Sequence, residues 1–144
     1  MSRRLFLLAV SPIVCTVIGA FAGGIYISMA GIEDGLSVSR VALNFPMAML
    51  ASLVVVLPVG LVTGLLGASL ALVLERTALR LAARSRWLQA GAGAGGVGGL
   101  LVALLFLLIG LDSVGALLAL GASWLSGTAV GWLGWREFGG QATS

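Results

Sequence analysis

The residue types that most often carry chemistry are scarce in this chain. There is no His among its 144 residues, and Cys15 is its single Cys. A catalytic triad with an imidazole base therefore cannot form. Zinc, haem and iron–sulfur sites normally draw on His or on several Cys. Glu33 and Asp34 are adjacent carboxylates, but such a pair in a loop is more often solvated than bound to a cation. We predict no catalytic residue, no metal site and no cofactor.

The other polar groups within the apolar parts of the chain are mainly hydroxyls. A Ser or Thr hydroxyl in a membrane helix usually donates to a carbonyl of the preceding turn. An ionisable residue within a span would indicate function by default, and none lies well inside the four apolar runs described next. This pattern argues against ion-driven transport and against hydrolysis, and we expect a protein that is not an enzyme.

The composition predicts a membrane protein. Hydrophobic residues make up 60% of the chain and charged residues 9%, whereas a soluble domain has roughly 25% charged residues. Four runs carry no charge: 5–30, 41–74, 87–111 and 113–135. A helix needs about 20 apolar residues to cross a bilayer. The sequence therefore predicts an all-α integral membrane protein, a four-transmembrane-helix bundle in one domain over 1–144.

The approximate spans are 5–30, 46–74, 88–111 and 114–135. The second span is expected to begin where Asn44 precedes Pro46, because Asn is a favoured N-cap and Pro is tolerated in the first turn. Only Asp112 and its neighbours separate the last two runs, which predicts a tight helical hairpin.

The arginines predict the topology. All eight basic residues are Arg, and they concentrate before the first run and between the second and third. Positively charged loops stay on the cytoplasmic side, so we expect both ends of the chain in the cytoplasm. Trp87, Trp132 and Trp135 are expected near that interface, where indole rings favour the headgroup region. We predict a multi-pass protein of a bacterial inner (cytoplasmic) membrane.

The start of the chain also resembles an export signal. Residues 2–7 read Ser-Arg-Arg-Leu-Phe-Leu, which is similar to the twin-arginine signature, and residues 20–22 form a small-x-small site. Because the apolar run continues to residue 30, a retained span is the favoured interpretation.

Small residues recur at four-residue spacing in the predicted spans, in the manner of a glycine zipper. Residues four apart share one face of a helix, and small side chains let another helix approach closely. The residues expected to form packing or partner-facing small-xxx-small faces are Gly60, Gly64, Gly91, Gly95, Gly99, Gly115, Ser123, Gly127 and Gly131. Whether these faces pack internally or against another subunit stays open in the sequence.

A basic stripe follows the second span. Arg76, Arg80 and Arg84 are four residues apart, and Arg86 follows. We predict a cytoplasmic helix extension over 75–87 whose arginines fix the topology and reach anionic lipid headgroups. A docking face for an acidic partner is an alternative. Nucleic-acid binding is not expected, because no recognition module accompanies these arginines.

Two functions are consistent with these features. The leading hypothesis is an accessory, assembly or structural subunit of a larger membrane complex, with other membrane proteins as partners. The alternative is a small channel or facilitator formed by self-association, which predicts a hydroxyl-lined path across the bilayer.

Overall fold

The chain is all-helical in the computed structural model, which describes residues 2–77, 83–110 and 112–138. Four α-helices follow one another: α1 (Arg3–Glu33), α2 (Val38–Thr77), α3 (Ala83–Leu108) and α4 (Ser113–Phe138). Each contains a stretch long and apolar enough to cross a membrane. The predicted four-span membrane protein is confirmed at this level.

The turns at the two hairpin tips follow local sequence signals. Gly35 has φ +88°, and its N–H donates to the Ile32 carbonyl while that of Leu36 reaches Gly31. This is the Schellman ending, which needs a residue with positive φ. Gly110 has φ +89° in the second turn. The short link between α3 and α4 confirms the predicted tight hairpin.

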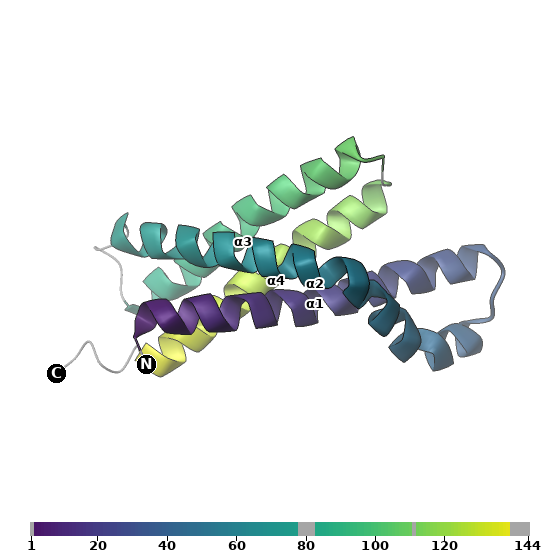
Figure 1. The fold of residues 1–144 in the computed structure, drawn as a ribbon, viewed down its shortest axis with the longest axis horizontal. Coiled ribbons are helices and arrows are strands. Elements are labelled where there is room, and N and C mark those ends of the chain that lie inside the picture. Colours follow the sequence, from purple (N-terminus) through teal and green to yellow (C-terminus); the bar gives the residue numbers. More distant parts are fainter. Residues whose placement is uncertain (1, 78–82, 111, 139–144) are drawn as a thin grey trace.

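The predicted start of the second helix is wrong. Helix α2 begins at Val38, and both Asn44 and Pro46 lie inside it. Contacts with α1 account for the earlier start: the rings of Phe45 and Phe21 lie 6.0 Å apart, so this segment gains packing by staying helical. Figure 1 shows that α2 bends part-way along its length, as expected of a helix that contains prolines.

The helices form two hairpins of unequal length. Helix α1 packs along α2 and α3 along α4, while α1 also meets α4 and α2 meets α3. Helices α1 and α2 have 31 and 40 residues, whereas α3 and α4 have 26 each. As Figure 1 shows, the hairpins cross and then diverge, and the α1–α2 hairpin reaches beyond the α3–α4 turn.

The core lies where α1 begins and α4 ends. Phe6 and Phe138 meet edge to face with ring centroids 5.3 Å apart, and Trp87 stacks on Phe138 at 6.0 Å. Trp87 is only 5% exposed, and its predicted depth near the cytoplasmic interface stays a prediction. Its side chain fills the gap between helices, while Trp132 is exposed and lies under Arg136.

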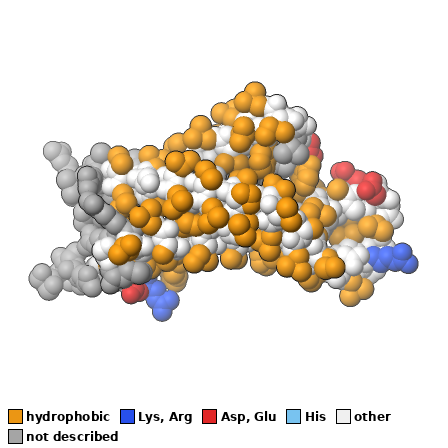
Figure 2. All heavy atoms as spheres, viewed as in Figure 1, with side chains coloured by type: hydrophobic (Ala, Val, Ile, Leu, Met, Phe, Trp, Pro, Cys, Tyr) orange, Lys and Arg blue, Asp and Glu red, His pale blue; other side chains and the backbone are white. Residues whose placement is uncertain are grey.

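The outer surface is apolar along the helices. Among the coloured residues on the face in Figure 2, charged side chains lie near the two hairpin turns and near the opposite end of the molecule. Helix α2 is the least buried of the four helices: 17% of its most apolar 18-residue segment is buried, against 22–28% for the others. This distribution suits a molecule surrounded by hydrocarbon.

Candidate functional site

The glycines of α3 and α4 lie against each other. A Cβ added at Gly91 would meet the Gly127 carbonyl oxygen, and one added at Gly127 would meet the Gly91 carbonyl oxygen. A Cβ added at Gly95 would lie 3.1 Å from Gly127 Cα. A Cβ added at Gly131 would lie 2.5 Å from the Trp87 carbonyl oxygen. Two backbones can come this close only without side chains between them. These glycines therefore face the inside of the α3–α4 hairpin.

A serine reinforces each hairpin. The Ser123 hydroxyl donates to the Gly95 carbonyl at 2.9 Å, and a Cβ at Gly99 would lie 3.1 Å from Ser123 Cβ. The Ser52 hydroxyl lies within hydrogen-bond distance of the Ala20 carbonyl of α1 at 3.1 Å, and it shares its one hydrogen with the Met49 carbonyl of its own helix at 2.8 Å. Each of these bonds joins two helices within one hairpin.

The glycines of α2 face α1. A Cβ at Gly60 would lie 2.7 Å from the Thr16 hydroxyl oxygen, and one at Gly64 would lie 2.7 Å from Pro12 N. Ala68, the next small residue along this face, is 1% exposed. Helix α2 therefore also has its small residues turned inward.

Gly115 has different neighbours from the other small residues of α4. A Cβ added there would lie 3.3 Å from the Tyr26 ring of α1 and 3.1 Å from the Asp112 carboxylate. In the half of α4 nearer the turn, the small residues at four-residue spacing that begin with Gly115 therefore no longer face α3. Ala119, the next of these residues, lines a cavity instead.

This cavity, of about 350 Å³, lies between the two hairpins. Its lining comes from all four helices and is mostly apolar, and α3 contributes only Val102 and Phe106. Two other lining residues, Ile27 and Val55, are 40% and 61% exposed, so the cavity opens on the outer surface of the bundle. It exists because the hairpins diverge, as Figure 1 shows.

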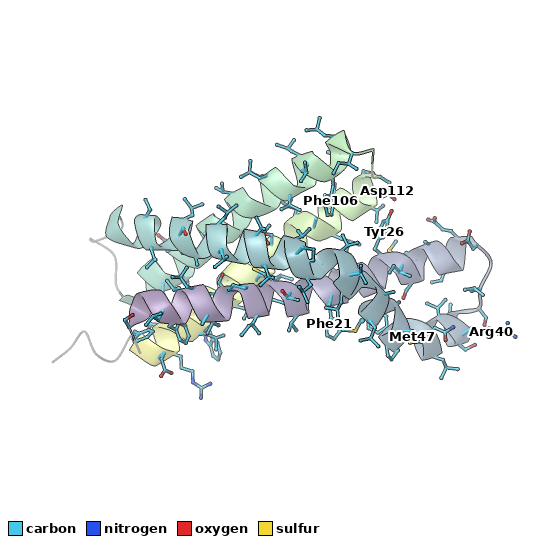
Figure 3. The ribbon with its side chains drawn as sticks, viewed as in Figure 1. Phe21, Tyr26, Arg40, Met47, Phe106 and Asp112 are labelled. Carbon is cyan, nitrogen blue, oxygen red and sulfur yellow. The ribbon has the colours of Figure 1, made fainter. Side chains whose placement is uncertain are left out.

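Polar side chains lie at the end of the cavity nearer the α3–α4 turn. Tyr26 lines it, and its ring lies beside the Asp112 carboxylate, since a Cβ added at Gly115 would be within 3.3 Å of both groups. The Asp112 carboxylate also accepts the Gly115 N–H at 3.0 Å, which caps the first turn of α4. Figure 3 shows Tyr26 and Asp112 close together, with Phe106 nearby. The sequence interpretation had assigned this tyrosine and this carboxylate no common role.

Most hydroxyls in the middle parts of the helices donate to backbone carbonyls. Thr16, Thr63, Ser126 and Thr128 each donate to the carbonyl four residues earlier, at 2.6–2.8 Å. A hydroxyl engaged in this way offers less to a passing ion or water molecule. Within the described ranges, no three His, Cys, Asp or Glu side chains are grouped so that they could hold a metal ion.

The basic stripe is described only at its two ends. Arg76 lies in the last turn of α2, and Arg84 and Arg86 lie in the first turn of α3. Arg80 falls outside the described residues, as do the side chains of the other three. The extension over 75–87 and its contacts stay a prediction.

No protein-family model matches the chain, and neither the curated proteins nor the solved structures include a match to it. The functional argument therefore rests on the geometry of this molecule.

Proposed function

We propose that the protein is a non-enzymatic accessory subunit that packs against a transmembrane helix of a larger membrane protein through the outer face of α2. The observation that carries this proposal is a regular exposed stripe. Its members are spaced alternately by three and four residues, and they are Met47, Leu50, Val54, Leu57 and Leu61.

The spacing of this stripe favours a helix as the partner. A repeat of 3.5 residues keeps one face of a helix against a neighbour in a left-handed crossing, which is the commonest crossing in membrane bundles. The side chains of the stripe are 45–79% exposed. The same helix turns its small residues, Gly60 and Gly64, toward α1. Helix α2 thus has one face engaged internally and another free for a partner.

Two observations weigh against a channel formed by self-association. The hydroxyls of Ser52 and Ser123, which line the cavity, are bonded to carbonyls, and the one buried hydroxyl without a partner among the described residues, Ser28, does not line it. The glycine faces of α3 and α4, which could have joined subunits around a pore, contact each other instead. An accessory subunit needs neither free hydroxyls along a path nor glycine faces on its outer surface.

Site-specific photocrosslinking tests the proposal. A photoreactive phenylalanine analogue is placed singly at Leu50, Val54 or Leu57, and at Leu101 of α3 as a control with a 61% exposed side chain. Irradiation in native membranes, followed by identification of the adducts, should give one membrane protein at the α2 positions and none at Leu101. Equal capture at Leu101, or no protein adduct from α2, would refute the proposed face. Adducts of the chain with itself alone would favour the self-associated channel.

We further propose that the protein lies in a bacterial inner membrane with both ends in the cytoplasm. The arginines at the start of α1 and those around the link from α2 to α3 support this orientation. Alkaline phosphatase inserted at Asp34 should be active outside the cytoplasm, and a fluorescent protein fused after residue 144 should fold inside it. The reverse pattern would contradict the orientation.

A further inference from the structure

We infer that the cavity between the two hairpins binds one acyl chain of a bilayer lipid, and that Asp112 and Tyr26 select a lipid with an ammonium headgroup. This site is separate from the outer face of α2 and goes beyond the proposed accessory role.

The cavity is elongated along the helices. Cys15 and Tyr26 both line it, and eleven helical steps between them span about 17 Å at 1.5 Å per residue. A mostly apolar cavity of this length with a volume of about 350 Å³ suits an extended hydrocarbon chain.

The lining and the opening both favour a lipid. Its walls are mostly apolar, and the Ser52 and Ser123 hydroxyls that line it are bonded to backbone carbonyls. Water would find few partners there, and an apolar cavity without such partners does not hold water stably. Ile27 and Val55 at the rim are exposed toward the surrounding hydrocarbon. An acyl chain can therefore enter sideways from the bilayer.

The polar end of the cavity favours a cationic headgroup. The carboxylate of Asp112 caps α4 through Gly115, and a carboxylate accepts several hydrogen bonds, so it retains capacity for an ammonium group. The Tyr26 and Phe106 rings line the same cavity, and aromatic rings attract cations.

The charge balance at this end excludes an anionic headgroup as the preferred ligand. The described turns of the two hairpins carry the carboxylates of Glu33, Asp34 and Asp112, while Arg40 near the start of α2 is the one basic residue there. Figure 3 shows Arg40 at the far tip of the α1–α2 hairpin, away from Tyr26 and Asp112. A zwitterionic lipid such as phosphatidylethanolamine can place its ammonium group against Asp112.

Lipid retention measured by native mass spectrometry tests the inference. The purified full chain is reconstituted in nanodiscs containing equal amounts of phosphatidylethanolamine and phosphatidylglycerol, then released, and its bound lipids are counted. We expect one retained lipid and an excess of phosphatidylethanolamine of about two- to fivefold, which corresponds to a surface cation–π or ion-pair contact. Equal retention of the two lipids would overturn the headgroup assignment.

Two variants separate the acyl-chain site from the headgroup site. Ala119→Leu fills the cavity and should abolish retention, whereas Ala9→Leu, at an exposed position outside the cavity, should not. Asp112→Asn preserves an N-cap acceptor but removes the charge, and it should retain a lipid without the headgroup preference. Unchanged retention in Ala119→Leu would overturn the cavity assignment. Thermal stability of each variant in the same nanodiscs identifies loss of fold, and in that case Ala122→Val, a smaller filling change in the same cavity, replaces Ala119→Leu.

Discussion

Replacing Gly127 with Ala should separate α3 from α4. A Cβ at Gly127 would meet the Gly91 carbonyl oxygen and lie 2.8 Å from Gly95 Cα. Ordinary contact of a Cβ begins at 3.4 Å, so the backbones must move apart by at least about 0.6 Å. The three atoms nearest to this Cβ are backbone atoms of Gly91 and Gly95. A change of side-chain rotamer therefore cannot relieve the clash, and the helices themselves must move.

The expected loss in the free energy of unfolding is about 1–3 kcal/mol, the usual cost of overpacking a close contact. Separation would also weaken the Cα–H···O contacts between the two glycines and the opposite carbonyls, which contribute about 0.5–1 kcal/mol each. A change of this size is measurable by unfolding in mixed micelles with increasing SDS.

Gly121→Ala is the matched control on the same helix. A Cβ at Gly121 would have nothing within 4 Å. Both changes convert Gly to Ala inside α4, so both gain the same helix propensity, which is about 1 kcal/mol in water. The difference between the two variants therefore isolates the packing cost. If Gly127→Ala is as stable as Gly121→Ala, the close approach of α3 and α4 is incorrect.

Three further changes test local features. Ser123→Ala should lower the free energy of unfolding by about 0.6 kcal/mol, the average for a hydrogen bond between membrane helices, because the Gly95 carbonyl loses its donor. Ser69→Ala removes a bond within one helix and should cost less. The opposite order of the two variants in SDS unfolding would contradict this assignment. Asp112→Ala should lower the free energy of unfolding by about 0.5–2 kcal/mol, because α4 loses its N-cap. Asp112→Asn keeps a capping oxygen, so it should be as stable as the unchanged protein if capping is the cause. Gly35→Ala should cost about 1–2 kcal/mol, because φ is +88° there and a Cβ is disfavoured in the left-handed region. In the same SDS unfolding assay, a stability equal to that of the unchanged protein would show that this turn relaxes.

The sequence predicts the architecture well because long charge-free runs leave few alternatives. The four spans and the short turn before α4 follow from where charges interrupt apolar residues. The start of α2 was mispredicted because a local cap signal at Asn44 and Pro46 competes with packing of Phe45 against Phe21. Only the folded structure contains that long-range contact.

The cavity could not be predicted from the sequence. Its walls consist of residue types found in any membrane span, such as Ala119 and Val55, and it arises from the angle between two hairpins. The proximity of Tyr26 and Asp112 around Gly115 joins residues 86 positions apart in the chain. A tyrosine near a span end and a carboxylate in a turn each have an ordinary local explanation, so neither signals the other.

The unequal length of the two hairpins has a consequence for where the protein resides within a membrane. The charge-free run 41–74 of α2 has 34 residues and would extend about 51 Å if straight, against a hydrocarbon thickness of about 30 Å. Tilt alone would have to reach about 54°, beyond the observed range of about 0–40°. The bend of α2 in Figure 1 shortens its reach only in part. Hydrophobic mismatch should therefore thicken the bilayer around this hairpin and concentrate the protein where the membrane is already thickest.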